Sequence, residues 1–594
     1  MQQTYSPAWD LDVIFPGGSE STDFRIYVNT IRNDMGRLAG TVNSYTPAPG
    51  KGNNQELIDI VKQLESAMKK LREASAFVSC LTAQDVKDEK ANLLEGQRNE
   101  LKAEMSGIRT NFNQKLATID DKTWDELSDQ PELAELSFIL NESREQAKDE
   151  LSVKEEVLMN DLAVDGYHAW NQMYGTIVGN MSVEIEEDGE VKAYSVGQAS
   201  NKLSNPVRSV RKHVSEQLDK AWSSQAALFA QTLNHLAGFR LQKYKHRSWE
   251  SVLKEPLAIN RMKKETLEAM WTAITNNKSH FVDYLQKKAE LLGLEKLSMY
   301  DVGAPLTDSV KQLSYTEGAA FIVDHFRKFS PKMADFAKMA FAKRWIEAED
   351  RPGKRPGGFC TSFPDSGQTR IFMTYSGTPS NIATLAHELG HAYHQHVMND
   401  VNGLNQGYAM NVAETASTFA EMIVADASVK NAKNSDEKKA LLEDKIKRSV
   451  AFFMNIHARF IFENRFYEER KQGMVSVQRL NELMVEAQKE AYEDAVTDYD
   501  PNFWASKLHF HITGVPFYNF PYTFGYLFSL GIYAHAKEKG GSFEDDYIAL
   551  LRDTGSMNVE DLAEKHLNVD LTKPDFWENA IGLCINDVEE FLAL

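Results

Sequence analysis

The chain has 594 residues, of which 42% are hydrophobic and 26% charged, so it can bury a large core and is neither disordered nor collagen-like. Its 66 Lys and Arg against 86 Asp and Glu give a net charge of −20, which excludes nucleic acid as an expected partner. Three widely spaced cysteines fit neither a disulfide framework nor a Cys-rich zinc module and favour a reducing compartment. With no basic and apolar leader, and no apolar run long enough to span a bilayer, we expect a cytoplasmic protein without membrane association.

Long amphipathic helices are predicted from about residue 54 to residue 150. This stretch is rich in Leu, Ala, Glu, Lys and Gln and has almost no Gly or Pro. Apolar residues recur at helical spacing, as in Leu57, Ile60, Val61 and Leu64. The N-terminal part of the chain is therefore expected to be helical.

A β-hairpin is predicted near residues 183–194. Val183, Ile185, Val191 and Tyr194 alternate with charged residues around the tight-turn pair Asp188-Gly189. A break at Asn205-Pro206 follows, and then a further helix is predicted over 207–244. We place the boundary between an N-terminal helical lobe, 1–200, and a second domain, 201–594, in this region.

The stretch 351–381 differs from the predicted helical stretches because it is rich in Pro and Gly. Within it, residues 369–375 have the composition of a β-strand. Helix resumes after Pro379, with Ser380 or Asn381 as its expected cap, and dominates the rest of the chain. The predicted fold class is mostly α, with a small β element directly before the helix that carries the chemistry.

That helix contains His387-Glu388-Leu389-Gly390-His391. The two histidines are four residues apart, so their rings project from one face of a helix and suit Zn²⁺, which takes N and O ligands tetrahedrally. Glu388, beside the first histidine, can act as the general base that accepts a proton from a metal-activated water. The alternative interpretation is a His-rich surface helix.

A third protein ligand is needed, and two residues compete for the role. His394 lies on a nearby face of the same helix, but one straight helix rarely supplies three ligands to one ion. Glu414 begins a second helical pattern and would complete the His₂Glu set of many zinc peptidases, so we expect one Zn²⁺ per chain on His387, His391 and Glu414. Glu421, seven residues later on the same face, is expected to hydrogen-bond a ligand histidine, although a plain solvated glutamate is the alternative.

The zinc helix followed by Glu414-Thr415-Ala416-Ser417 resembles the M3 family of zinc oligopeptidases, and its oligoendopeptidase F branch in particular. Residues 357–360, the strand that ends at 375–377, the segment 511–522 and Trp9-Asp10-Leu11 also resemble this branch. The resemblance implies a two-lobed helical fold whose deep central channel buries the site, and a zinc-dependent endopeptidase that acts on short peptides.

The resemblance also implies roles for further residues. His511, Tyr518 and Tyr522 are expected to stabilise the negative oxygen that develops on the tetrahedral carbon, which is chemistry that imidazole and phenol donors suit. His509 does not fit the interval of the family, and the role of Tyr526 stays open. Substrate backbone is expected to add to an exposed strand edge, and the substrate-binding residues predicted there are Gly357, Gly358, Phe372 and Tyr375.

The sequence therefore predicts a metalloendopeptidase. A zinc carboxypeptidase on a similar fold would need a cationic group for the substrate's C-terminal carboxylate. A non-catalytic helical peptide-binding protein is the alternative outside the enzymes, and the presence of Glu388 argues against it, because binding zinc does not require that carboxylate. Cleavage preference, substrate length limits, the physiological substrate and oligomeric state do not follow from the sequence.

Overall fold

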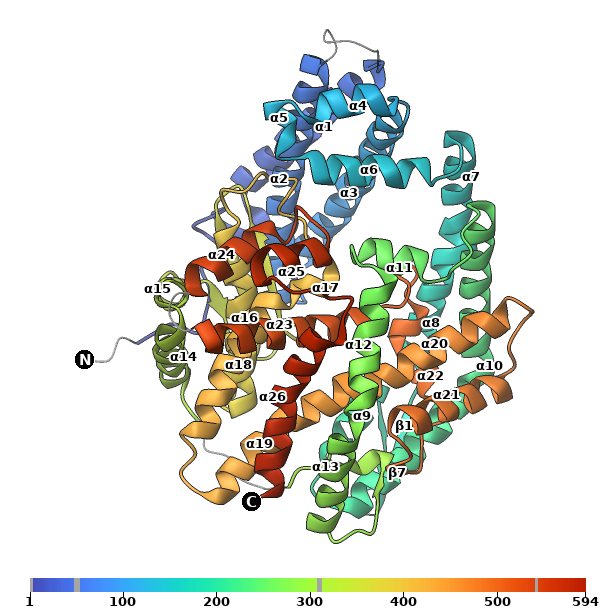
Figure 1. Ribbon diagram of the computed structural model, residues 1–594, viewed down its shortest axis with the longest axis vertical. Helices are drawn as coiled ribbons and strands as arrows, with labels where there is room; N and C mark the ends of the chain where they lie inside the picture. The colour runs from blue at the N-terminus through green and yellow to red at the C-terminus, as the bar shows by residue number, and fades with distance from the viewer. Residues whose placement is uncertain (1–3, 48–53, 188, 307–311, 540–542) are drawn as a thin grey trace. The chain divides into compact units, whose positions relative to one another are not determined.

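The computed structural model describes residues 4–47, 54–187, 189–306, 312–539 and 543–594, and these are mostly helical, as predicted (Figure 1). Sheets within this described part are small: a hairpin, a two-residue parallel pair and a three-stranded sheet. No helix there has both the length and the apolar run that crossing a membrane requires.

The chain forms two compact units whose segments alternate along the sequence. The first unit comprises 1–150, 311–427 and 535–568, and the second comprises 151–310, 428–534 and 569–594. A single division near residue 200 was expected, whereas residues 151–200 pack with the second unit and the chain enters each unit three times. Such alternation depends on contacts between helices that are distant in sequence, which local patterns do not report.

Unit 1 holds most of the predicted N-terminal helices and the zinc-helix motif. Its elements are η1 (Gly18–Glu20), α1 (Thr22–Ser44), α2 (Asn54–Gln84), α3 (Glu89–Ala117), α4 (Asp121–Ser128), α5 (Pro131–Ala134), α6 (Ser137–Lys148), α14 (Tyr315–Phe329), α15 (Pro331–Ala342), β4 (Ile346–Glu347), β5 (Phe359–Phe363), β6 (Gln368–Phe372), α16 (Pro379–Val397), α17 (Met410–Ala413), most of α18 (Thr415–Lys430), the end of α23 (Phe520–Lys539), α24 (Phe543–Asp553) and α25 (Val559–Leu567).

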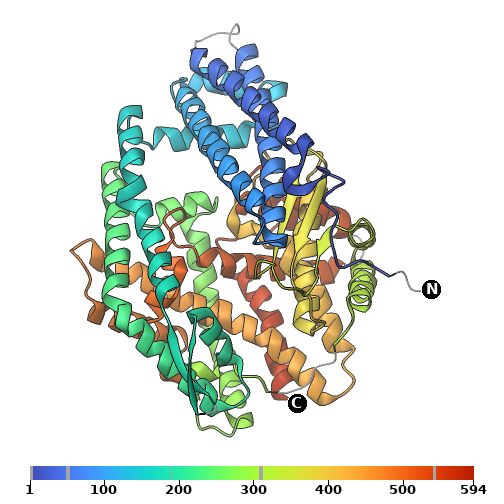
Figure 2. The same cartoon turned by 180° about the vertical axis from the view of Figure 1, so that it is seen from behind.

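The apolar faces of α1, α2 and α3 meet in one core. On α2, Leu57, Ile60, Val61 and Leu64 are buried, which confirms the helical spacing predicted from the sequence. The core continues to Phe363 and Phe372, so the helices pack directly on the three-stranded sheet beside them (Figure 2).

The strand order in that sheet is β4-β6-β5, which makes β6 the central strand. β6 pairs parallel with β4 and antiparallel with β5, and it ends at Phe372 rather than at Tyr375. The expectation that Phe372–Tyr375 offers a free edge is therefore wrong. The two-residue strand β4, whose pairing occupies that backbone, is too short to be recognised in the sequence. Among the described residues β4 and β5 each pair only with β6, so both are edge strands, and β5 is the longer one, with a free edge along five residues.

Unit 2 is helical around the long α10, and it contains the predicted hairpin, whose turn residue Asp188 lies outside the described residues. Its elements are α7 (Val153–Ala163), the π-helical turn η3 (Val164–His168), α8 (Ala169–Asn180), β1 (Val183–Glu187), β2 (Glu190–Tyr194), α9 (Val196–Asn201), η4 (Lys202–Ser204), α10 (Arg208–His246), α11 (Lys254–Ile259), α12 (Lys264–Asn276), α13 (Lys278–Leu291), β3 (Leu297–Ser298), η5 (Met299–Asp301), α19 (Ser435–Val450), the π-helical turn η6 (Ala451–Asn455), α20 (Ile456–Arg470), α21 (Val477–Ala491), β7 (Val496–Thr497), α22 (Phe503–Ser506), η7 (Leu508–His511), the start of α23 and α26 (Pro574–Leu592).

Candidate metal centre

The helix that carries both histidines is α16, and its start is capped by Thr378. The Thr378 side chain accepts a hydrogen bond from the backbone N–H of Asn381, with Pro379 in the first turn. The cap therefore lies two residues before the expected Ser380. Asn381 serves the preceding turn instead, because its Oδ1 accepts the backbone N–H and the hydroxyl of Ser376.

Glu414 approaches the histidines from the junction between α17 and α18. Gly390, inside the motif, allows this approach: a Cβ at that position would lie only 2.4 Å from the carbonyl oxygen of Ala416 and 2.5 Å from Cα of Ser417. The backbones of α16 and α18 therefore touch at this glycine. A side chain there would force the helix that follows Glu414 away from the histidines.

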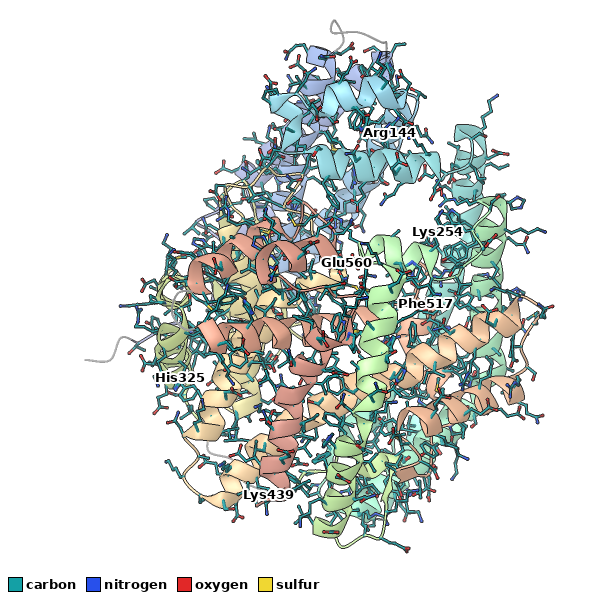
Figure 3. All side chains as sticks on the ribbon, in the orientation of Figure 1. Arg144, Lys254, His325, Lys439, Phe517 and Glu560 are labelled. Carbon is teal, nitrogen blue, oxygen red and sulfur yellow. The ribbon has the colours of Figure 1, made fainter. Side chains whose placement is uncertain are left out.

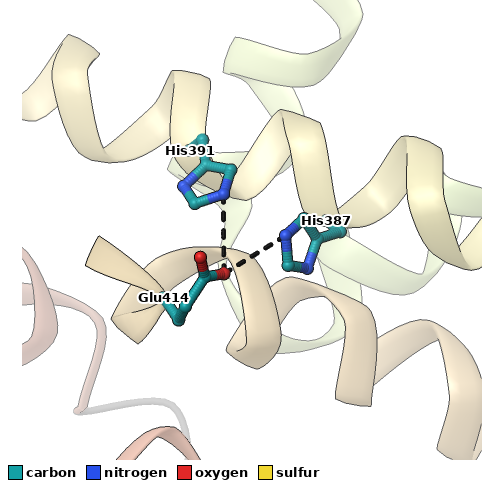
Figure 4. A group of neighbouring side chains, drawn as sticks. All are labelled: His387, His391 and Glu414. Atoms are coloured by element: carbon teal, nitrogen blue, oxygen red, sulfur yellow. Dashed lines mark ion pairs between the residues drawn. The ribbon is translucent and has the colours of Figure 1, made fainter. Parts of the chain in front are cut away.

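His387, His391 and Glu414 form a cluster whose ligand atoms all lie within 4.8 Å of one another (Figure 4). Glu414 Oε2 lies 3.2 Å from His387 Nε2 and 3.5 Å from His391 Nε2. Two atoms that each bind one Zn²⁺ at about 2.05 Å in tetrahedral geometry are separated by about 3.3 Å. The donor set and its spacing therefore fit a zinc ion, and it is the cluster expected from the sequence.

The surroundings favour the protonation states that a metal ion requires. Burial lowers the pKa of His391 to about 4, so its ring is neutral at pH 7. Burial alone would raise the pKa of Glu414, but the neighbouring rings of His387 and His391 outweigh it and hold this pKa at about 2. The neutral ring of His391 and the ionised carboxylate of Glu414 can thus bind a metal without first losing protons.

Glu388 lies beside the cluster with its carboxyl group buried. Its Oε2 has no hydrogen-bond partner among the described residues, and burial raises its pKa to about 7. A Cβ at Gly358 would lie 3.6 Å from Glu388 Oε1, so the backbone that leads into β5 passes next to this carboxyl group. A base with a pKa near neutrality, next to a free strand edge, is suited to moving a proton at a bound peptide.

Glu421 contacts Nδ1 of His387, the ring nitrogen that is not directed at the cluster. Its Oε2 lies 3.1 Å from His387 Nδ1, which leaves Nε2 directed at Glu414. A carboxylate in this position keeps Nε2 unprotonated and holds the plane of the ring. The backbone of Ala413 hydrogen-bonds the ring of His391 and orients it in the same way.

Replacing Glu421 by Gln is expected to weaken metal binding by about 10- to 100-fold without abolishing it, because an amide orients the ring less strongly than a carboxylate. Metal affinity is measured by competition with a chromophoric chelator. Asp426→Asn is the matched control, since that carboxylate pairs with Lys537 rather than with a ligand. An affinity equal to that of the unchanged protein would mean that Glu421 does not orient His387.

His394 does not join the cluster. Its Nε2 lies 2.9 Å from Thr554 Oγ1 and 3.1 Å from the carbonyl oxygen of Leu551, and burial lowers its pKa to about 3. Its ring stacks on that of Tyr408 at 4.2 Å.

Tyr408 was not anticipated from the sequence, yet its hydroxyl lies within electrostatic reach of Glu414, Cys360 and Arg72. Nothing in the loop sequence around Tyr408 marks this position.

The residues expected to stabilise the oxyanion all belong to unit 2, and within that unit His511 lies apart from Tyr518 and Tyr522. His511 is buried, stacks on Tyr174 at 4.2 Å, and has Nδ1 3.2 Å from Thr232 Oγ1 and Nε2 3.4 Å from the carbonyl oxygen of Trp504. A ring so engaged is a core residue. In the 3-10 helix η7, residues two apart point in different directions, so the side chain of His509 does not point into the core with that of His511.

His509, rather than His511, lies beside the two tyrosines. Its ring centroid is 5.4 Å from that of Tyr518 and 6.5 Å from that of Tyr522, and the two tyrosine rings are 5.8 Å apart. All three side chains are partly exposed. Burial, with the charges of Arg459 and Lys507, lowers the pKa of His509 to about 4. The sequence analysis assigned this role to His511 because the interval from His509 to Tyr518 is longer than the corresponding interval in the family.

The backbone between His509 and Tyr518 is anchored to two buried ionisable side chains. Arg240 donates to the carbonyl oxygen of Ile512 at 3.2 Å, and Glu463 Oε1 accepts the backbone N–H of Phe517 at 3.1 Å. Phe517, labelled in Figure 3, has a positive φ of 51°, which turns the chain directly before Tyr518. Gly514, in the same segment, has open space around it and no positive φ.

Tyr526 is a packing residue of unit 2. Its hydroxyl lies 3.0 Å from Ser449 Oγ, and its ring stacks on Phe452 at 4.5 Å.

The side chains of two predicted substrate-binding residues, Phe372 and Tyr375, are also packed in the interior. Phe372 is fully buried against Trp9 and Phe359, and the Tyr375 hydroxyl donates to the carbonyl oxygen of Leu313 at 3.2 Å. Gly357, with a φ of 92°, and Gly358 lie at the start of the free-edged β5.

Comparisons with known proteins agree with this site. The sequence model of Peptidase family M3 matches residues 202–583, more than half of the chain, and that of Oligopeptidase F matches residues 115–182. An oligoendopeptidase F homolog of Lactococcus lactis subsp. lactis is 23% identical over 98% of this chain and 96% of its own length. Oligopeptidase PepF of Bacillus subtilis is 23% identical over 80% and 72% of the two chains.

Solved structures share the fold. Oligoendopeptidase-F from Enterococcus faecium superposes with a TM-score of 0.69 at 17% identity, covering 96% of this chain and 99% of its own. A structure from Chlamydophila abortus superposes with a TM-score of 0.82 at 18% identity, covering 99% and 98%. The chain therefore belongs to peptidase family M3, in its oligopeptidase F branch, and is a metalloendopeptidase.

Proposed function

We propose that the protein is a zinc-dependent oligoendopeptidase of the cytoplasm that hydrolyses internal bonds of short peptides. The observation that supports this most directly is the His387, His391 and Glu414 cluster with the buried carboxyl group of Glu388 beside it. The names of the relatives, oligoendopeptidase F and oligopeptidase, support short peptides as substrates. Three free cysteines support a reducing compartment.

The roles of the residues follow from their positions. When bound, zinc supplies a Lewis acid that polarises the scissile carbonyl and lowers the pKa of a water molecule. His387, His391 and Glu414 hold the ion, and Glu421 orients His387. Glu388 accepts the proton of the attacking water and passes it to the leaving amine. The backbone at Gly357 and Gly358 and the edge of β5 align an extended peptide beside Glu388 by strand addition.

For the oxyanion we propose Tyr518, Tyr522 and His509 as donors. Their mutual proximity and partial exposure support this assignment, as does the resemblance of the segment to the family. We do not retain His511 in the proposal, because both of its ring nitrogens face core partners of unit 2.

The function is tested with a pool of peptides of 5 to about 20 residues, blocked at both ends, whose products are identified by mass spectrometry. We expect internal cleavage that stops on chelation and returns with added zinc. A protein that cuts only peptides with a free C-terminus would be a carboxypeptidase. A zinc-loaded protein that cuts none of them would be a binding protein.

Tyr518→Phe is expected to lower kcat by about 10²–10³-fold and to change KM little, because it removes one O–H donor without changing the shape of the side chain. Steady-state kinetics on a blocked peptide measure both constants. Tyr526→Phe is the matched control, since it removes a buried hydroxyl of unit 2 and is expected to affect stability rather than kcat. A rise in KM alone for Tyr518→Phe would place Tyr518 in ground-state binding.

A further inference from the structure

A cavity of about 600 Å³ lies in unit 1 between α2, α3 and β5. Three of its lining side chains are cationic, namely Arg72 of α2 and Lys102 and Arg109 of α3, and none of the lining residues is acidic. This contrasts with a chain whose net charge is −20. The side chain of Arg72 is half-buried, while those of Lys102 and Arg109 are more exposed. The cavity is thus a local positive site in an acidic protein.

The cavity opens at the free edge of β5. Thr361 and Ser362, which are consecutive in the strand, both line it. Successive residues of a strand point to opposite faces, so a cavity that contacts both lies at the strand's edge rather than on one face. Among the described residues β5 pairs only with β6, so this is the edge on which a peptide can add.

The cavity lies at a fixed interval from the reacting centre. Gly358, next to the carboxyl group of Glu388, precedes Thr361 by three residues and Ser362 by four. At about 3.3 Å per residue of strand, the distance along the edge is about 10–13 Å. A peptide cleaved beside Glu388 would therefore reach the cavity with a residue three or four positions from its scissile bond. That interval is too long for an exopeptidase that removes single residues.

No carboxylate within the described residues pairs with the three cations. The pKa of Arg72 is lowered by burial, and the only group that opposes this is the Tyr408 hydroxyl. Burial and the charge of Arg98 lower the pKa of Lys102, and the carboxylate that opposes this effect, Glu95, is held by Arg98 at 2.7 Å. The hydroxyl of Ser75, also in the wall, is buried without a hydrogen-bond partner. Unpaired cations and an unused donor in one cavity fit an anionic ligand.

Tyr408 connects this cavity to the metal centre. Its hydroxyl lies within electrostatic reach of both Arg72 and Glu414. One tyrosine hydroxyl is therefore near both a cation of the cavity and a metal ligand, as expected for a part of the substrate site. An arginine is also suited to the task, because its planar guanidinium binds both oxygens of a carboxylate at once.

We propose that this cavity binds a carboxylate of the peptide substrate, three or four residues from the bond that is cleaved. The inference rests on the proposed function and specifies its substrate class. Two sources supply the same chemistry: the C-terminal carboxylate of a short peptide, or the side chain of an Asp or Glu residue. In the first case the cavity restricts the length of the peptides that are cleaved. In the second case it favours peptides with an acidic residue at one position.

The test compares peptides that differ in one charge. One pair has a C-terminal acid or amide, and further pairs have Glu or Gln at each position up to four residues on either side of the cleaved bond. For the zinc-loaded enzyme we expect kcat/KM to be about 10- to 100-fold higher for the charged member of one pair, mainly through KM. Arg72→Gln is expected to remove this preference, and the pair that shows it identifies the source.

Lys62→Gln is the matched control, because Lys62 lies exposed on the same helix and does not line the cavity. It removes the same charge and should keep the preference. Lys102→Gln and Arg109→Gln, at exposed positions of α3, each should reduce it and provide the test if Arg72→Gln does not fold. Circular dichroism reports folding. Equal kcat/KM within every pair, or an unchanged preference in all three cavity variants, would overturn the proposal.

Equilibrium binding separates this inference from the proposed function. The same peptide pairs, labelled with a fluorophore, are titrated by anisotropy against Glu388→Gln, which should bind without turnover, and against the double variant that also carries Arg72→Gln. Tighter binding of the charged peptides to the single variant alone supports the carboxylate site, whether or not any peptide is cleaved. Cleavage without any charge preference in binding would leave the peptidase function standing and refute the site.

Discussion

Replacement of Glu388 by Gln is expected to lower kcat by about 10²–10⁴-fold while the protein keeps its metal ion. The amide has the shape of the carboxylate but cannot accept a proton, and the side chains of His387, His391 and Glu414 are untouched. Because Glu388 Oε2 has no partner among the described residues, the substitution breaks no hydrogen bond made by that oxygen. The measurements are kcat on a blocked peptide and metal content by elemental mass spectrometry.

Glu443→Gln is not a suitable control for this experiment, because that buried carboxylate pairs with Lys288 and its loss would leave a buried cation unpaired and destabilise unit 2. Glu317→Gln is a better one, since it changes a capping carboxylate of unit 1 that lies at the start of α14. Its kcat should be unaffected. Parallel loss of metal and activity in Glu388→Gln would show that Glu388 is a ligand rather than the base.

Replacement of Glu414 by Ala is expected to reduce metal affinity by more than the roughly 100-fold upper range for residues that only orient a ligand. Glu414 is the only one of the three clustered side chains that comes from outside α16, and its Oε2 faces both histidine Nε2 atoms. Without it, two histidines of one helix remain, which is too few for a tight zinc site. Competition with a chelator at equilibrium measures the loss.

His394→Ala is the matched comparison, since His394 lies on α16 but bonds to Thr554 and Leu551 instead of the cluster. It should lower the free energy of unfolding, by about 1–3 kcal/mol for the buried partners that it leaves unpaired, and spare metal affinity. If His394→Ala lost the metal and Glu414→Ala kept it, the third ligand would lie on the same helix as the first two.

The candidate metal cluster was predictable because its chemistry is local in sequence. The interval from His387 to His391 places both rings on one helical face, and Glu414 directly precedes α18, the helix that carries Glu421. The same is true of the hairpin, whose strands β1 and β2 are close neighbours in sequence and pair antiparallel. Patterns within a few turns of chain are enough for such features.

Other features depend on contacts between distant segments and were missed. The central position of β6 comes from its pairing with the two-residue β4, about 25 residues earlier, so no alternation in the sequence marks it. The assignment of His511 failed for a similar reason. His509 and His511 are both next to aromatic residues in sequence, and only the packing of Tyr174 and Thr232 distinguishes them. The touching backbones at Gly390 and the approach of Tyr408 are likewise tertiary.

The contact at Gly390 has a consequence for which ion the centre can select. Because the backbones of α16 and α18 touch there, the main chains that carry the histidines and Glu414 lie as close as two helices can, with the ligand oxygen of Glu414 3.2 Å from His387 Nε2. A small cation that binds at about 2.0–2.1 Å fits that spacing, whereas Ca²⁺, at about 2.3–2.6 Å and with six to eight oxygen ligands, requires a wider cage. At the zinc site that we propose, a single missing side chain therefore favours small ions over large ones without contacting the ion.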